Sequence, residues 1–278
     1  MRNPSVPRKR PRLVMLVAGL VLAGIAVAGL AGSPQPAVPH RVLLVGNSVV
    51  YTNNLPAVLH ALAVTQQPAA DMRIDMFAPG GATLSETVAN LRLRTALSNG
   101  HYDAVILQER GGDAMCAASA KARGETECRD MIRAARDLAE AARRAGASVW
   151  YLGTYQVMPQ ASEALVAGER WIAGRMSARY IEISQSLQAL RRSLPDLRWQ
   201  YSESDFHPGP ATTSLLAIRI HAALTGTDPQ PADLCTTARM LTPGDGSDDV
   251  VPFETLAADS GTKTCLLTKA QFGQLLGK

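Results

Sequence analysis

Short apolar runs alternate with longer amphipathic stretches along most of this chain. The runs are rich in β-branched residues and several are closed by glycine, which is typical of buried strands. We expect strands at Arg41–Gly46, Met72–Ala78, Tyr102–Leu107, Val149–Leu152 and Tyr180–Ile183. We expect helices at Leu55–Gln66, Leu84–Leu97, Glu125–Ala145, Glu163–Ala178, Ser184–Leu194 and Ala211–Leu224. This alternation predicts βαβ units, and therefore an α/β fold: a three-layer α/β/α sandwich around a parallel five-stranded sheet.

The pattern also divides the chain into three parts. Residues 1–40 comprise a basic arm, an apolar segment and the proline-rich linker SPQPAVPH. Residues 41–226 carry the strand and helix pattern, so we expect one domain there. Residues 227–278 are rich in turn-forming residues, with TPGDGSDD in the middle, and are expected to form an appendage to that domain.

The apolar segment Leu13–Gly32 contains no charged residue and follows the basic run RKRPR. A bilayer-spanning helix needs about 20 apolar residues, whereas the apolar core of a signal peptide has about 7–15. Ala26-Val27-Ala28 resembles a cleavage site, so an uncleaved anchor and a cleaved signal both remain open. In either case we expect export of the chain from residue 33 onward, to the membrane surface, the periplasm or the extracellular space.

The formal net charge of +4 comes from the arm rather than from the body of the protein. Five of the 28 basic residues lie in the first 32 positions, so 23 basic residues face 24 acidic ones in the rest of the chain. The body carries no basic stripe, which argues against a nucleic-acid partner.

The chain has four cysteines, Cys116, Cys128, Cys235 and Cys265. An even number in an exported chain favours disulfides, for which three pairings are possible. We favour Cys116–Cys128 and Cys235–Cys265, because each pair brackets a loop segment that contains glycine or proline. A zinc site is disfavoured because there is no C-x-x-C motif and no nearby histidine pair.

Candidate chemistry lies at the carboxyl ends of the predicted strands, where ligands gather in open parallel sheets. The candidate blocks are Gly46–Ser48, Pro79–Thr83, Gln108–Gly112 and Ser204–Pro208. Ser48 is a candidate nucleophile, but a hydroxyl needs a neighbouring base to accept its proton. Its N–H could also help to bind an oxyanion. The plainer interpretation of this block is a tight turn from strand to helix.

His207 is the natural base because it alone of the five histidines lies in a polar loop, fixed by Pro208 and Pro210. Asp205 could orient its imidazole as in a catalytic triad, although it could equally cap a turn. Gly81 could direct its N–H into a site, and Gln108 could offer a side-chain amide. A plain turn and a solvated strand end are the structural alternatives for these two residues.

Together the blocks GNSxxYTNNLP, PGGAT, YDAVILQE and DFHP resemble the SGNH (GDSL-like) hydrolase superfamily, in the branch with G-N-S in place of G-D-S. The resemblance extends from Arg41 to Leu224. It implies a flavodoxin-like fold and a serine esterase or deacetylase. It also implies that Ser48 is the nucleophile, that His207 is the base, and that the N–H groups of Ser48 and Gly81 bind the oxyanion.

The sequence departs from the family pattern at two places. The Asn that usually completes the oxyanion hole is missing after the third strand. Gln108, or a peptide of Gly111 or Gly112, would have to replace it, and we favour Gln108 because related branches carry L-Q-E. The usual acid precedes the histidine by three residues, but that position is Ser204 here. Asp205 would act instead, or a backbone carbonyl would orient His207 in a Ser-His dyad.

We therefore predict an exported serine esterase that hydrolyses short-chain carboxylic esters, with O-acetyl groups on a polysaccharide as the favoured substrate. Neither a cofactor nor a metal is required, and the membrane is a partner through the N-terminal segment. The alternative is a catalytically silent, membrane-tethered module of the same fold that binds a glycan or a protein. A flavodoxin-type nucleotide binder is excluded by the lack of a glycine-rich phosphate loop.

Overall fold

The computed structural model describes residues 38–156 and 158–277. The predicted anchor or signal segment lies outside these residues. Within the described part, no helix is both long enough and apolar enough to span a bilayer.

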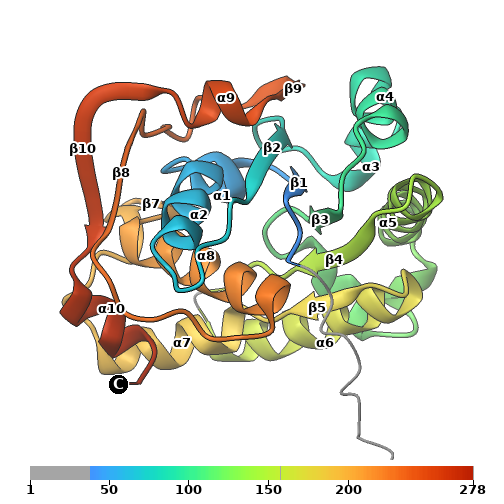
Figure 1. Cartoon of the computed structure of the whole chain (residues 1–278). Helices are drawn as coiled ribbons and strands as arrows, with labels where there is room; N and C mark the ends of the chain where they lie inside the picture. The colour runs from blue at the N-terminus through green and yellow to red at the C-terminus, as the bar shows by residue number, and fades with distance from the viewer. Residues whose placement is uncertain (1–37, 157, 278) are drawn as a thin grey trace, which may run out of the picture. The chain divides into compact units, whose positions relative to one another are not determined.

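A six-stranded sheet with the strand order β5-β4-β3-β1-β2-β9 forms the centre of the fold (Figure 1). Its parallel strands are β1 (Arg41–Val45), β2 (Arg73–Ala78), β3 (Ala104–Gln108), β4 (Ser148–Leu152) and β5 (Arg179–Ile181). The predicted parallel strands are therefore confirmed. The sixth strand, β9 (Ser247–Val251), comes from the C-terminal segment and pairs antiparallel with β2 at the sheet edge.

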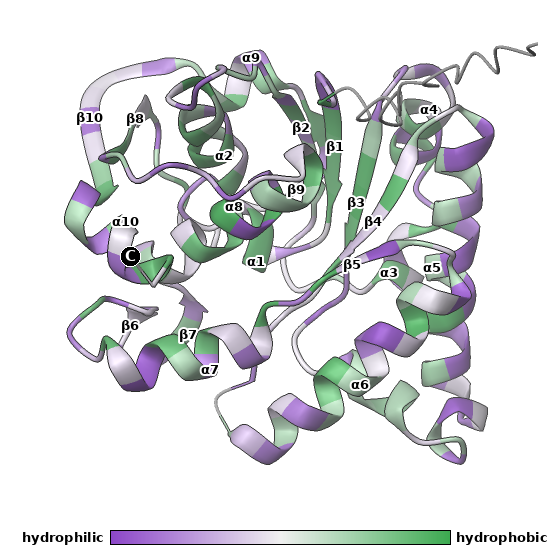
Figure 2. Cartoon of the chain, turned by 60° about the horizontal axis from the view of Figure 1, so that its bottom comes forward, coloured by the Kyte–Doolittle hydropathy of each residue, from purple (hydrophilic) through white to green (hydrophobic). Residues whose placement is uncertain are grey.

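The central strands are mostly apolar because helices cover both faces of the sheet. Along β1, Val42 and Leu44 point into one core, and Leu43 and Val45 point into the other. Side chains alternate between the faces of a strand, so a strand that is covered twice shows a continuous apolar run. Figure 2 shows these strands as a hydrophobic centre between helices with mixed faces.

Long helices form the two outer layers. One core is covered by α2 (Leu55–Val64), α7 (Ser184–Ser193) and α8 (Pro210–Thr225). The other is covered by α4 (Leu91–Asn99), α5 (Thr126–Arg144) and α6 (Pro159–Arg175). The shorter helices are α1 (Ser48–Tyr51), α3 (Leu84–Thr87), η1 (Asp113–Ala118) and η2 (Ala122–Gly124).

The single helix predicted at Leu84–Leu97 is wrong, because the structure has two helices there. Thr83, and not the expected Ser85, caps α3 in a capping box with Glu86. The side chain of Asn90 then accepts the N–H groups of Arg92 and Leu93 and begins α4. Asparagine is a strong helix N-cap, so a new start is favoured over continuation at this position.

The C-terminal segment packs against the start of α2. It contains β8 (Leu234–Ala238), β10 (Asp259–Leu267), α9 (Phe253–Leu256) and α10 (Lys269–Leu275). The side chain of Asn54 donates to the carbonyls of Arg239 and Leu256, at 2.9 and 2.8 Å. The N–H of Asn53 donates to the Leu241 carbonyl at 2.8 Å. The asparagines that follow Ser48 therefore fasten this segment to the sheet.

Both predicted disulfides are present. Cys116–Cys128 links η1 to α5, and Cys235–Cys265 joins paired residues of β8 and β10. Two disulfides are typical of proteins that fold outside a reducing cytoplasm.

Gly168 allows α6 to pack closely on η1. A Cβ atom at this position would lie 1.9 Å from the carbonyl oxygen of Ala114. We expect Gly168→Ala to lower the unfolding temperature, because the clash costs about 1–3 kcal/mol and exceeds the gain in helix propensity. Thermal denaturation followed by circular dichroism measures this effect.

The matched control is Gly174→Ala on the same helix, where a Cβ would meet no atom within 4 Å. This change should raise the unfolding temperature or leave it unchanged, since alanine is favoured over glycine in a helix by about 1 kcal/mol. Equal unfolding temperatures for the two variants would contradict the close packing at Gly168.

Candidate active site

A cavity of about 830 Å³ lies at the carboxyl ends of the central strands and brings the predicted blocks together. Its walls include Ser48, Gly81, Gly111, Asp205 and His207. These residues follow β1, β2 and β3 or lie on the short strand before α8, so they are distant in sequence. The carboxyl edge of the sheet is the place where an open α/β fold positions ligands.

Ser48 is the first residue of α1 and follows β1 directly. Asn47 caps this helix by accepting the Val49 N–H at 3.2 Å, and its amide donates to the Ala82 carbonyl at 3.1 Å. A Cβ on Gly46 would lie 2.5 Å from Oε1 of Gln108. The G-N-S block therefore combines a close approach, a cap and a half-buried serine in the cavity wall at the tip of a buried strand.

Tyr51 lies one turn after Ser48 and is buried. Its hydroxyl donates to the Pro243 carbonyl at 2.5 Å. Burial raises the pKa of Tyr51, and a hydrogen bond with the Ser48 hydroxyl opposes this rise. Tyr51 thus links Ser48 to the C-terminal segment through hydrogen bonds to both.

Asp205 and His207 contact each other directly. Both lie on β7 (Asp205–Pro208), which pairs antiparallel with β6 (Gln200–Ser202). Residues two apart on a strand share one face, so this geometry accommodates the two-residue spacing in DFHP. His207 Nδ1 lies 2.5 Å from Asp205 Oδ1, and the His207 backbone N–H donates to the same oxygen at 3.0 Å.

The electrostatics of this pair favour an oriented imidazole. Hydrogen bonding by the His207 backbone N–H is the main cause that lowers the pKa of Asp205, so the carboxylate stays ionised. An ionised carboxylate accepts a hydrogen bond from Nδ1–H. In a neutral ring with the proton on Nδ1, Nε2 is free to accept a proton.

Gln108 does not line the cavity. Its side chain is buried, and its amide nitrogen donates to the carbonyl of Glu109. Its Oε1 lacks a hydrogen-bond partner in the described part of the chain. The alternative donor Gly111, by contrast, lies in the cavity wall.

Three backbone N–H groups in the wall, those of Ser48, Gly81 and Gly111, have no acceptor among the described residues. The Ser48 N–H belongs to the first turn of α1, where helical N–H groups have no partner within the helix. Gly81 occupies the third position of a turn closed by Ala82 N–H and Pro79 O at 3.4 Å. The φ angles of Gly81 and Gly111 are +67° and +43°, a region that favours glycine.

Glu109 and Arg110 received no role from the sequence, yet they hold the segment from Gly81 to Leu84. The Glu109 carboxylate is buried and accepts the N–H groups of Arg110 at 2.7 Å and Leu84 at 3.3 Å. The guanidinium of Arg110 donates to the Gly81 carbonyl at 3.2 Å and pairs with Asp113 at 2.9 Å. Two adjacent charges directly after a buried strand were the only signal in the sequence.

A second buried carboxylate, Glu169 on α6, was also missed. It accepts the Thr154 N–H at 2.7 Å and the Tyr180 hydroxyl at 2.6 Å. Burial raises the pKa of Glu169 and that of Glu109 to about 7, against the effect of these hydrogen bonds. Its position inside an amphipathic helix gave no sequence signal beyond a glutamate on the apolar face.

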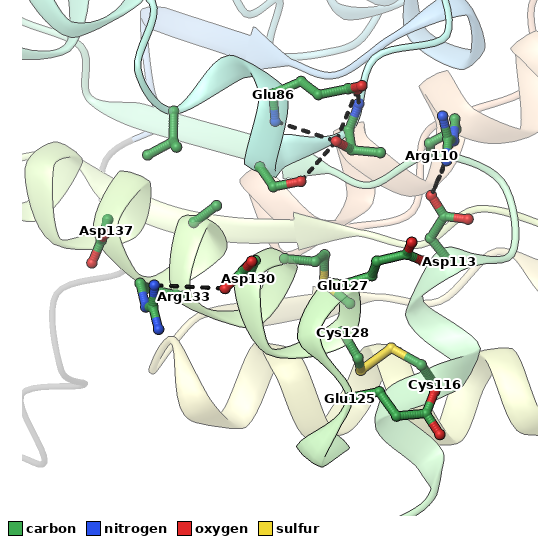
Figure 3. A pocket seen from close by; sticks show the side chains of 15 residues that line it. Glu86, Arg110, Asp113, Cys116, Glu125, Glu127, Cys128, Asp130, Arg133 and Asp137 are labelled. Carbon is green, nitrogen blue, oxygen red and sulfur yellow. Dashed lines mark hydrogen bonds and ion pairs between the residues drawn. A yellow bond between two sulfur atoms is a disulfide. The ribbon is translucent and has the colours of Figure 1, made fainter. Parts of the chain in front are cut away.

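A separate acidic groove of about 670 Å³ shares Arg110 with the cavity (Figure 3). Its carboxylates are Glu86, Asp113, Glu125, Glu127, Asp130 and Asp137. In the figure, Arg110 pairs with Asp113 and Arg133 pairs with Asp130. Among the residues that the structure describes, no group of three or more His, Cys, Asp or Glu side chains is arranged to hold a metal ion.

No family model and no curated protein matches the sequence. Solved structures do match. A DUF4886 family protein from Bacteroides uniformis shares 15% identity and a TM-score of 0.54, over 68% of this chain and 83% of that one. A catalytic mutant of Axe2, an acetylxylan esterase from Geobacillus stearothermophilus, shares 12% identity and a TM-score of 0.51, over 70% and 97% of the two chains. The acetyl xylan esterase AlAXEase shares 13% identity and a TM-score of 0.51, over 66% and 98%.

At identities this low, the structural similarity shows a shared fold alone. These structures have the fold of the SGNH (GDSL-like) hydrolases. The chain has the α/β fold of that group, with a mostly parallel sheet between helices, as its sequence blocks predicted.

The buried carboxylates make stability depend on pH. Because the pKa of Glu169 is raised from 4.5 to about 7, the folded protein retains a proton that the unfolded chain releases. Stability due to this group is therefore highest below pH 4.5 and falls as the pH rises to about 7. Glu169→Gln cannot ionise, so we expect it to lose less stability than the wild type between pH 4.5 and 8, by on the order of 1–3 kcal/mol.

Urea denaturation at several pH values measures this difference. Glu163→Gln is the matched control, because it makes the same change at an exposed position of α6. The control should follow the wild type at every pH. Parallel curves for Glu169→Gln and the wild type would show that the buried carboxyl does not titrate in this interval.

Proposed function

We propose that this protein is a serine esterase that hydrolyses carboxylic esters through an acyl-enzyme. The observation that carries the proposal is the cavity itself. It gathers a serine at a helix start, a histidine bonded to an aspartate, and backbone N–H groups that have no acceptor within residues 38–156 and 158–277. These are the parts that acyl transfer requires: a nucleophile, an oriented base and an oxyanion site.

In the proposed reaction, Nε2 of His207 accepts the Ser48 proton as the serine Oγ attacks the ester carbonyl carbon. The carbonyl electrons move onto the oxygen, and the N–H groups of Ser48 and Gly81 hold this oxyanion. His207 then gives its proton to the leaving alcohol as the carbon–oxygen bond breaks. Water, deprotonated by His207, attacks the acyl-enzyme and releases the acid and free Ser48.

Asp205 stabilises the imidazolium that forms twice in this cycle and keeps Nδ1 protonated. The contact of 2.5 Å between its Oδ1 and His207 Nδ1 supports the triad over the Ser-His dyad. The third oxyanion donor was assigned to Gln108 from the family resemblance. For that role the Gln108 amide would have to leave the Glu109 carbonyl and turn towards the cavity.

We propose short-chain esters, with O-acetyl groups on a polysaccharide as the substrate class. Val49, Tyr155 and Phe206 give the cavity an apolar part, while Arg110, Gln156 and Ser204 give it a polar part that suits a hydroxyl-rich alcohol. Two similar structures belong to acetylxylan esterases, which supports this choice at the level of the fold. The uncharged segment Leu13–Gly32 and the two disulfides support export, with the membrane or the periplasm as the location.

Ser48→Ala tests the nucleophile. Hydrolysis of a short acyl ester such as 4-nitrophenyl acetate should fall by at least about 10³-fold, because the variant lacks the hydroxyl proposed to form the acyl-enzyme. The circular dichroism spectrum should stay unchanged. A fluorophosphonate probe should label the wild type at Ser48 and leave the variant unlabelled.

The silent binding module predicts a different result. A folded wild-type protein that neither hydrolyses esters nor reacts with the fluorophosphonate would rule out the esterase. The substrate class is tested by comparing kcat/KM for acetylated xylo-oligosaccharides with kcat/KM for esters of longer acyl chains. A higher value for the longer-chain esters would contradict the acetyl-glycan proposal.

Asp205→Asn tests the triad. The amide can present its N–H to Nδ1 and favour the wrong tautomer, so kcat should fall by about 10²–10⁴-fold at pH 7. The control is Asp196→Asn, an exposed aspartate in the segment before β6. A loss below about threefold in Asp205→Asn would favour the dyad, in which a backbone carbonyl orients His207.

A further inference from the structure

The loop after β3 is held so that Gly111 turns its N–H towards the catalytic cavity. The Arg110 carbonyl accepts the Asp113 N–H at 3.1 Å. In a trans peptide the N–H of the next residue points opposite to that carbonyl. The Gly111 N–H is therefore directed away from η1, it has no acceptor in the described part of the chain, and Gly111 lines the cavity.

Thr154 fixes the other side of Gly111. Its hydroxyl donates to the Gly111 carbonyl. This bond joins the loop after β4 to the loop after β3. One peptide plane at Gly111 is thus fixed by Asp113 and the next by Thr154. With both planes fixed, the φ angle of Gly111 is set at +43°, where a residue with a Cβ would be strained.

Thr154 is in turn anchored by Glu169. The Thr154 N–H donates to Glu169 Oε1 at 2.7 Å, and both side chains are almost completely buried. The Tyr180 hydroxyl holds the second carboxyl oxygen at 2.6 Å. A Cβ on Gly153 would lie 2.8 Å from this oxygen, so glycine leaves the room that the carboxyl needs. This buried network has no surface role that would explain it.

We propose that Thr154, anchored by Glu169, is a positioning residue that presents the Gly111 N–H as the third oxyanion donor, in place of Gln108. The inference rests on the proposed esterase function. It gives the N–H groups of Ser48, Gly81 and Gly111 one shared role, and it explains why the chain does without the family's asparagine. Gln108 is left with a packing role beside Gly46.

The expected effect follows from the value of a fixed donor. Removing one oxyanion donor typically costs about 10²–10³-fold in kcat, and a donor that is only misplaced costs somewhat less. The oxyanion forms in the transition state, so such a loss lowers kcat and leaves KM nearly unchanged.

The test compares Thr154→Val with Thr154→Ser in the full chain. Valine keeps the size of threonine and removes the hydroxyl, whereas serine keeps the hydroxyl. With 4-nitrophenyl acetate we expect Thr154→Val to lower kcat by about 10–100-fold with KM within about threefold of the wild type. Thr154→Ser should restore kcat to within about threefold.

A boronic acid supplies a readout that a merely structural role would not change. It forms a tetrahedral adduct with an active-site serine, so its inhibition constant reports on the oxyanion site. The constant should rise in Thr154→Val by about the same factor as kcat falls. Thr212→Val is the matched control, because the buried Thr212 hydroxyl also donates to a backbone carbonyl, that of Trp199, outside the cavity wall.

The outcomes separate this inference from the proposed function. If the wild type is inactive towards esters, the proposed function fails and the inference fails with it. If the wild type is active and Ser48→Ala is not, wild-type kcat in Thr154→Val overturns only the positioning role. Equal losses of kcat in Thr154→Val and Thr212→Val would also overturn it, since general loss of packing would then explain both.

Discussion

Burial of the parallel strands on both faces decides where this chain can carry chemistry. Within β1 and β3 nearly every side chain enters one of the two cores, and a polar group there would lose its hydration without compensation. Polar residues are therefore displaced to the strand ends. Because β1, β2, β3 and β4 are parallel neighbours, their carboxyl ends share one edge, where Ser48, Gly81, Gly111 and Thr154 meet.

The edge needs rigid support, and two buried carboxylates supply part of it. Glu109 binds the N–H groups of Leu84 and Arg110, while Glu169 binds Thr154 and Tyr180. A carboxylate accepts several hydrogen bonds at once, so one side chain can join loops that follow different strands. Burial disfavours the charged form of each carboxyl and raises its pKa to about 7. Ionisation of these groups in the folded protein therefore costs stability. Such a cost is common where a protein fixes the geometry of a site at the expense of stability.

The sequence predicted most of the fold because the period of its apolar residues records burial, and burial on two faces leaves a continuous run in each parallel strand. It also predicted that Ser48, Gly81, Asp205 and His207 would lie near one another, since each follows or precedes a recognisable element. It did not predict β9, whose short sequence SDDVV has no alternating pattern and pairs at the sheet edge, or the break at Asn90. The roles of Thr154 and Glu169 depend on contacts between elements, and no local pattern encodes them. The side-chain direction of Gln108 likewise depends on the space left by Gly46.

The C-terminal segment extends this dependence to the nucleophile. Tyr51, Asn53 and Asn54, all within six residues of Ser48, hydrogen bond to backbone groups of Pro243, Leu241 and Arg239. Asn53 and Asn54 have φ angles of 59° and 55°, which non-glycine residues adopt at a cost. The bonds to the C-terminal segment help to offset this cost, together with those from the Asn53 amide to Pro208 and Thr213. The Cys235–Cys265 disulfide restrains the same segment. The geometry of Ser48 therefore depends on residues almost two hundred positions later in the chain.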